Sequence, residues 1–122
     1  MLFRSLRGLG LTLGVVSNFD SRVYSVLDEL GIHEFFSSVT ISSETGYAKP
    51  DPEIFAAAVR AASAPAERIL FAGDSLMDDY QGASAAGLAA VLVDRPGRYA
   101  QMRAVTRIST LTELVPLVSA KD

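Results

Sequence analysis

Three aspartates follow an apolar run near the middle of the sequence. Ile69 to Ala72 form this run and Gly73 lets the backbone turn, so Asp74 is expected at the carboxyl edge of a buried strand. Asp78 and Asp79 follow within five residues, and a cluster of carboxylate oxygens is what Mg²⁺ prefers. Alternatively, Asp78 or Asp79 begins the next helix, where a carboxylate offsets the helix dipole and caps free N–H groups.

Polar side chains also occur at two other points where the chain leaves an apolar run or enters a helix. Ser17 and Asn18 follow the first apolar run, and Lys49 precedes a helix. A hydroxyl and a backbone amide can hold a phosphoryl oxygen, and an ammonium group can balance charge in a transition state. Together with the acidic cluster, these groups predict a phosphate and magnesium site in one crevice. Taken singly, Ser17 and Asn18 could be turn or capping residues, and Lys49 could be a surface lysine.

Apolar strands alternate with amphipathic helices along the whole chain. This pattern is typical of an α/β fold, in which helices cover both faces of a parallel sheet. We expect four strands, over residues 11–16, 39–41, 69–72 and 90–93. Capping and stop signals place the helix ends, namely Asp20 or Ser21 with Gly31, Asp51 with Pro52, Gly87, and Thr110 with Glu113. Pro116 is expected to shorten or kink the last helix.

Composition narrows the class of protein. With 122 residues and 49% hydrophobic content, we expect a single domain over residues 1–122 with a packed core. The net charge of −3 argues against a nucleic-acid partner, and we interpret the arginines Arg95, Arg98, Arg103 and Arg107 as a solvated face. No apolar run reaches the roughly twenty residues of a membrane span. The absence of cysteine fits a reducing compartment, and we expect a cytoplasmic protein.

Three segments, in this order, resemble the haloacid dehalogenase superfamily in its phosphatase-like branch with an inserted cap. They are VVSN at residues 15–18, GYAKPDPEIF at 46–55 and GDSLMDDYQGASAAGL at 73–88. The resemblance implies a three-layer, Rossmann-like core. It also implies that Ser17 binds the phosphoryl group, that Lys49 stabilises its charge, and that Mg²⁺ is held by Asp74 and Asp79, with Asp78 a weaker choice.

The chain departs from the family at one point. Members begin with an aspartate-rich motif at the end of an earlier central strand, where one aspartate attacks phosphorus and a second acts as acid and base. No such segment is present, so the core is expected to be incomplete, lacking its central first strand and its cap. Two strands, at 11–16 and 69–72, would then have unpaired edges. We expect the chain to be marginally stable, to self-associate through these edges, or to close the gap by direct pairing.

The leading functional hypothesis is Mg²⁺-dependent hydrolysis of a small phosphate ester through an aspartyl-phosphate in the complete protein, with little turnover by this chain. Dehalogenation stays open. The alternative from another class is a non-catalytic module that binds Mg²⁺ or phosphate, or that completes a partner. A phospho-acceptor receiver domain fits less well, because it places its acids first and its lysine last, whereas Lys49 here precedes Asp74.

Overall fold

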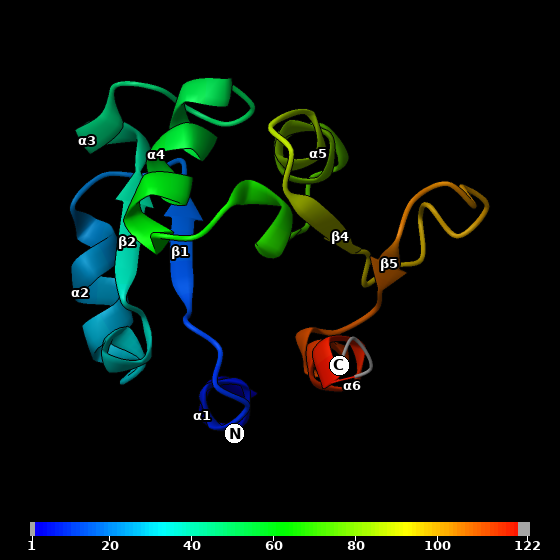
Figure 1. Cartoon of the computed structure of the whole chain (residues 1–122), viewed down its shortest axis with the longest axis horizontal. Helices are drawn as coiled ribbons and strands as arrows, with labels where there is room; N and C mark the ends of the chain where they lie inside the picture. The colour runs from blue at the N-terminus through cyan, green and yellow to red at the C-terminus, as the bar shows by residue number, and fades with distance from the viewer. Residues whose placement is uncertain (1, 120–122) are drawn as a thin grey trace.

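A computed structural model describes residues 2–119, in which strands and helices alternate (Figure 1). The strands are β1 (Gly14–Ser17), β2 (Ser38–Ile41), β3 (Leu70–Gly73), β4 (Ala89–Val93) and β5 (Arg107–Ile108). The α-helices are α1 (Leu2–Gly8), α2 (Arg22–Glu29), α3 (Ser42–Thr45), α4 (Pro52–Ala62), α5 (Gly82–Ala85) and α6 (Leu114–Ser119). Shorter turns are the 3₁₀ elements η1 (His33–Phe35), η2 (Ala66–Arg68) and η4 (Leu111–Glu113), and the π-helix η3 (Leu76–Gln81).

The strands form two parallel sheets. In one sheet β1 pairs with β2, and in the other the order is β3-β4-β5. Within residues 2–119, β1 and β3 do not pair with each other, so the expectation that the gap closes by direct pairing is wrong. Both strands are instead placed by side chains of α4, because Val16 of β1 and Phe71 of β3 pack against its buried residues.

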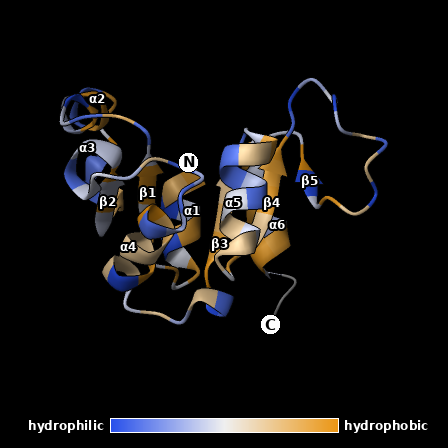
Figure 2. Cartoon of the chain, turned by 90° about the horizontal axis from the view of Figure 1, so that it is seen from above, coloured by the Kyte–Doolittle hydropathy of each residue, from blue (hydrophilic) through white to orange (hydrophobic). Residues whose placement is uncertain are grey.

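Alternate residues of the strands point to opposite layers of helices. In β1, Val15 packs with the cluster that contains Val23 and Leu27 of α2 (the α2 cluster). Val16 packs with the cluster that contains Ile54 and Phe55 of α4 (the α4 cluster). In β3, Phe71 packs with the α4 cluster, whereas Leu70 and Ala72 pack on the side of α6. Figure 2 shows β1, β3 and β4 coloured mainly as hydrophobic, beside helices that have hydrophilic residues. This period of two confirms the three-layer α/β fold that was predicted, with small and separate sheets.

Helix α4 forms as its sequence predicts. The Asp51 side chain accepts a hydrogen bond from the Glu53 backbone N–H at 2.9 Å, and Pro52 occupies the first turn. Ile54 and Phe55 are completely buried and form the centre of the cluster that joins the two sheets. The helix therefore connects the two halves of the molecule through its core face.

Several element boundaries differ from the sequence prediction. The first strand begins at Gly14 rather than Leu11, because its partner β2 begins only at Ser38. Helix α1 and the two-residue strand β5 were not predicted, and both are too short to show a clear hydrophobic period. The alanine-rich helix begins as the π-helix η3, with α5 as its only α-helical part.

The predicted helix stops and the last capping box are confirmed. Gly31 and Gly87 have positive φ angles of 71° and 90° at the ends of their helices. The Glu113 side chain accepts hydrogen bonds from the backbone N–H groups of Ser109 and Thr110, at 2.7 and 2.9 Å. Among residues 2–119, no helix combines the length and the apolar character that crossing a bilayer requires.

Candidate functional site

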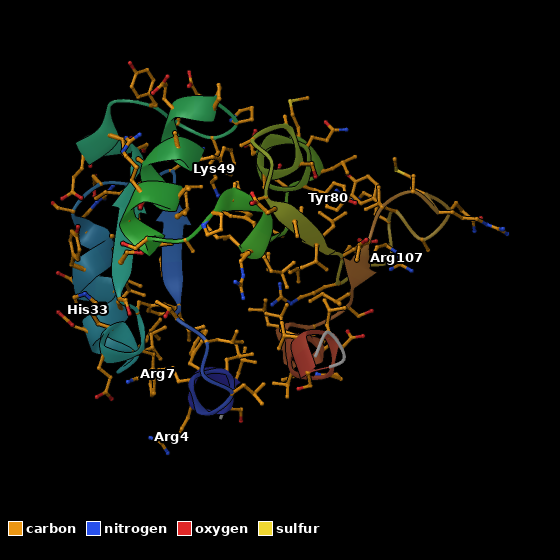
Figure 3. All side chains as sticks on the ribbon, in the orientation of Figure 1. Arg4, Arg7, His33, Lys49, Tyr80 and Arg107 are labelled. Carbon is orange, nitrogen blue, oxygen red and sulfur yellow. The ribbon has the colours of Figure 1, made fainter. Side chains whose placement is uncertain are left out.

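An open pocket of about 270 Å³ lies at the carboxyl ends of β1, β3 and β4. Its charged lining residues are Lys49, Asp74, Asp79 and Arg95, and its apolar wall includes Val16, Phe71, Val93 and Leu111. A second, smaller hollow of about 170 Å³ lies beside His33, whose Nδ1 pairs with Asp28 at 2.8 Å. Figure 3 shows Lys49 and His33 on different parts of the molecule, and His33 stays outside the charged pocket.

The centre of the pocket is an ion pair between its two halves. Lys49 Nζ lies 2.6 Å from Asp79 Oδ1, and their side chains are only 14% and 6% exposed. Asp79 Oδ2 also accepts a hydrogen bond from the Ser75 backbone N–H at 3.0 Å. Such a pair is largely removed from water, so each charge depends on the other.

Local backbone geometry brings Asp79 into this position. Ser75 caps η3 by accepting a hydrogen bond from the Asp78 backbone N–H at 3.0 Å, so neither aspartate is the capping residue. Within the π-helix, Asp79 is buried and lines the pocket, whereas Asp78 does not line it. Gly73 is required next to it, because a Cβ at that position would overlap the Asp79 carboxylate. The geometry thus favours Asp79 over Asp78 as a site residue.

Asn18 contacts the backbone of Lys49 rather than open space. Its Oδ1 accepts a hydrogen bond from the Lys49 N–H at 2.7 Å, and its Nδ2 donates to the Lys49 carbonyl at 3.2 Å. Ser17 precedes it at the end of β1 and is half-buried beside Val16. The structure therefore brings Asn18, Lys49 and Asp79 into one connected group, with Ser17 adjoining it.

Asp74 and Asp79 provide the donors that a hard cation would use. Asp74 is exposed, lines the same pocket, and makes no hydrogen bond or ion pair within residues 2–119. No group of three or more histidine, aspartate or glutamate side chains in that part of the chain could hold a metal ion. Mg²⁺ commonly takes one or two protein carboxylates and completes its shell with water and substrate phosphate, so these two donors fit it.

Arg95 is a pocket residue that the sequence analysis interpreted only as part of a solvated face. It is exposed, lines the pocket, and follows β4 at the same edge as Asp74. Arg107 also differs from a solvated arginine, since it is half-buried and its Nη1 lies 3.5 Å from Oδ2 of the buried Asp94. Of the four arginines, Arg98 and Arg103 are exposed, as predicted, and do not line the pocket. The position of Arg95 just after a strand was the signal that could have identified it.

The loop that carries Arg95 is tied to the pocket helix. The Asp94 carboxylate accepts hydrogen bonds from the backbone N–H groups of Arg98 and Tyr99, at 3.0 and 2.8 Å. On the other side, the Tyr80 hydroxyl of η3 accepts a hydrogen bond from the Thr106 N–H at 3.1 Å. Although the loop projects from the body of the molecule (Figure 1), both of its ends are held.

Known proteins resemble this chain in sequence. The family model described as "haloacid dehalogenase-like hydrolase" matches residues 1–87. The human haloacid dehalogenase-like hydrolase domain-containing protein 3 is 42% identical over 93 residues, which cover 76% of this chain and 37% of that protein. A glyceraldehyde 3-phosphate phosphatase from Methanopyrus kandleri is 41% identical over 98 residues, which cover 80% of this chain and 42% of the relative. The chain thus spans about two fifths of these curated relatives.

Solved structures resemble it over nearly its whole length. A HAD phosphatase from Thermococcus onnurineus matches with a TM-score of 0.89 and 28% identity, covering 96% of this chain and 54% of that structure. The HAD-hydrolase YfnB from Bacillus subtilis, in a structure bound to magnesium, matches with a TM-score of 0.80 and 29% identity, covering 97% and 52%. Sequence and fold agree, and the chain belongs to the haloacid dehalogenase-like hydrolases.

Proposed function

We propose that this chain supplies the phosphoryl-binding and metal-binding groups of a Mg²⁺-dependent phosphatase that acts on a small phosphate ester. The observation that carries this proposal is the buried contact between Lys49 Nζ and Asp79 Oδ1 in a pocket that Asp74 also lines. Relatives described as phosphatases and a neighbour bound to magnesium support it.

Each side chain has a distinct role in this proposal. The Lys49 ammonium has three donors, of which one is used by Asp79, so the others can hold phosphoryl oxygens. The Ser17 hydroxyl lies at the end of β1, where it can donate to the same phosphoryl group. Asp74 and Asp79 would hold Mg²⁺, which when bound supplies charge neutralisation at the phosphate. Arg95 adds a cation at the rim that attracts anionic esters.

The attacking group in the proposed reaction is a carboxylate outside this set. Among residues 2–119, the carboxylates that line the pocket are Asp74 and Asp79, and both are assigned to the metal. We therefore propose that the aspartyl-phosphate forms in the complete protein on a further carboxylate. This chain alone is expected to bind phosphate and metal with little turnover.

The same proposal covers partners and location. A pocket of about 270 Å³ suits a small phosphorylated metabolite, and the net charge of −3 disfavours nucleic acid. The absence of cysteine supports a reducing compartment, for which we propose the cytoplasm.

Calorimetric titration of the chain with inorganic phosphate, with and without Mg²⁺, tests the proposal. We expect the chain to bind phosphate, and Mg²⁺ to strengthen this binding. In the presence of Mg²⁺, Asp74→Asn should weaken phosphate binding about tenfold, because the metal loses one charged contact with the chain. Asp78→Asn is the matched control, because Asp78 does not line the pocket, and it should behave as wild type. Absence of phosphate binding with Mg²⁺, or an equal loss in both variants, would overturn the proposal.

Hydrolysis of an aryl phosphate tests the origin of the attacking carboxylate. We expect the wild-type chain with Mg²⁺ to be nearly silent. Turnover that disappears in Asp74→Asn and Lys49→Ala would show that a carboxylate of this chain attacks phosphorus, and the assignment to the complete protein would then be wrong.

A further inference from the structure

Asn18 satisfies both backbone polar groups of Lys49. The two residues are 31 positions apart, yet the Asn18 amide accepts from the Lys49 N–H at 2.7 Å and donates to its carbonyl at 3.2 Å. This paired contact ties the end of β1 to the loop that precedes α4. Other polar side chains of that loop bond to different residues, since Asp51 caps α4 and Thr45 bonds to Tyr47.

Lys49 needs such support because its surroundings do not favour it. It lies three residues before Pro52, where the positive end of the α4 dipole opposes a cation. Its side chain has four rotatable bonds, and ordering them costs conformational entropy. Nevertheless its Nζ lies 2.6 Å from Asp79 Oδ1 and 5.8 Å from the centre of the Phe71 ring. A fixed backbone at Lys49 leaves only these side-chain torsions to be ordered when the ammonium reaches Asp79.

We infer that Asn18 is a positioning residue, whose amide holds the Lys49 backbone so that the Lys49 ammonium reaches Asp79 across the two sheets. The inference goes beyond the proposed function, which gives Asn18 no role, and it differs from the sequence-based expectation that Asn18 helps to bind phosphate. The part of it that concerns phosphate rests on that function, because Lys49 is the group that would meet the phosphoryl oxygens. The positioning itself exists in the ligand-free protein and can be measured there.

The two possible roles of Asn18, phosphate binding and positioning of Lys49, predict different results in the ligand-free protein. If the Asn18 amide only binds phosphate, its removal leaves the Lys49 ammonium unchanged in phosphate-free buffer. If Asn18 positions Lys49, its removal frees the ammonium from Asp79 and exposes it to reagents. The sequence has only two lysines, Lys49 and Lys121, so the labelling of each can be followed by mass spectrometry of peptides.

The experiment is competitive amine labelling of the full chain at low reagent concentration, without phosphate or Mg²⁺, with Lys121 as the internal reference. Asn18→Ala should raise the labelling rate of Lys49 relative to Lys121 by about fivefold, as expected for the loss of one or two modest hydrogen bonds. Asn18→Asp keeps the acceptor for the Lys49 N–H but replaces the donor to the Lys49 carbonyl with an oxygen that this carbonyl repels, so Lys49 labelling should also rise, by about twofold or more.

Thr45→Val is the matched control. The Thr45 hydroxyl makes the same kind of paired contact, but with the Tyr47 backbone, at 2.9 Å to its carbonyl and 3.1 Å from its N–H. Its loss should leave Lys49 labelling unchanged, while circular dichroism confirms that each variant is folded. Where Asn18→Ala does not fold, Asn18→Asp decides.

An unchanged Lys49 rate in a folded Asn18 variant would overturn the inference, as would an equal increase in Thr45→Val. Because labelling needs no phosphate, these outcomes are independent of the phosphate titration that tests the proposed function. A chain that binds phosphate but shows no labelling change keeps the function and loses the inference. An increase in labelling without phosphate binding keeps the positioning and loses the function.

Discussion

The two sheets contribute different chemistry to the pocket. The sheet of β1 and β2, with the loop that follows it, provides the cation Lys49 to the pocket lining, with the neutral residues Ser17 and Asn18 beside it. The sheet of β3, β4 and β5 provides the acidic residues Asp74 and Asp79. The second sheet also supplies the cation Arg95 at the rim, but the buried pair of an ammonium with a carboxylate takes one residue from each side. The site therefore exists only where the two sheets meet, and that junction is maintained by the α4 core and by the ion pair of Lys49 with Asp79.

We expect the buried residues of α4 to contribute most to the stability of the junction between the two sheets. Phe55 is completely buried and packs against Phe71 of β3, with ring centres 5.3 Å apart. We expect Phe55→Ala to lower the free energy of unfolding by about 3 to 5 kcal/mol, since it removes a buried ring and leaves a cavity. Urea denaturation measures the change.

Tyr47→Ala is the control for the loss of an aromatic ring. Tyr47 is 47% exposed, so its removal should change the unfolding free energy by less than about 0.5 kcal/mol. Equal effects of the two substitutions would show that α4 does not hold the sheets together.

We expect the ion pair of Lys49 with Asp79 to make the second largest contribution to the stability of this junction. Lys49→Met leaves the buried Asp79 carboxylate without its cation, and we expect a loss of about 3 kcal/mol in unfolding free energy. The double replacement Lys49→Met with Asp79→Leu removes both charges and should cost less than the single change. The comparison uses the same urea titration. A double variant that is less stable than Lys49→Met would contradict the idea that an unpaired buried charge dominates.

Gly73 tests how closely β3 approaches the acidic residue. A Cβ at Gly73 would overlap the Asp79 carboxylate, so Gly73→Ala must displace one of them. We expect a loss of about 2 kcal/mol in unfolding free energy, together with weaker phosphate binding. Gly8→Ala is the control, because a Cβ at Gly8 meets nothing within 4 Å, and it should leave both measurements near wild type.

Local signals predicted the elements well, whereas contacts between distant residues could not be predicted. Asp51 and Pro52 begin α4 as expected, because a cap and a first-turn proline act within a few residues. The contact of Asn18 with Lys49 spans 31 positions, and nothing in a single sequence specifies it. Residue types at strand ends predicted which groups would gather, since parallel strands share one carboxyl edge. They did not predict which side chain would contact which.

The two separate sheets differ from one continuous sheet in the burial of their edge strands β1 and β3. All four residues of β3 are only half-buried, although Leu70 to Ala72 are apolar, and β1 is similarly half-exposed. A parallel strand covered on every side would be buried throughout. We propose that these edges cause self-association at high protein concentration. Sedimentation velocity over a range of concentrations should show a rising average mass, and a constant monomer mass would contradict it.

The smallest effect is expected for an ion pair far from the junction, which contrasts with the pair of Lys49 and Asp79. Asp20 accepts a hydrogen bond from Arg22 Nε at 2.8 Å, and this bond holds the pKa of Asp20 below its ordinary value of 3.8. Both side chains are well exposed to water, which screens their attraction. Because the folded pKa is the lower one, the stabilisation is present above pH 3.8 and is lost as the pH falls through the folded pKa.

Urea denaturation of wild type and Asp20→Asn at neutral and strongly acidic pH tests this sign. The wild type should be slightly more stable at neutral pH, and the difference should vanish in acid, where Asp20 is protonated. A difference of equal size at both values would show that the Asp20 side chain acts through its geometry rather than its charge. A difference as large as that of Lys49→Met would mean that exposure does not separate the two pairs, and the junction would lose its special place in the stability of the chain.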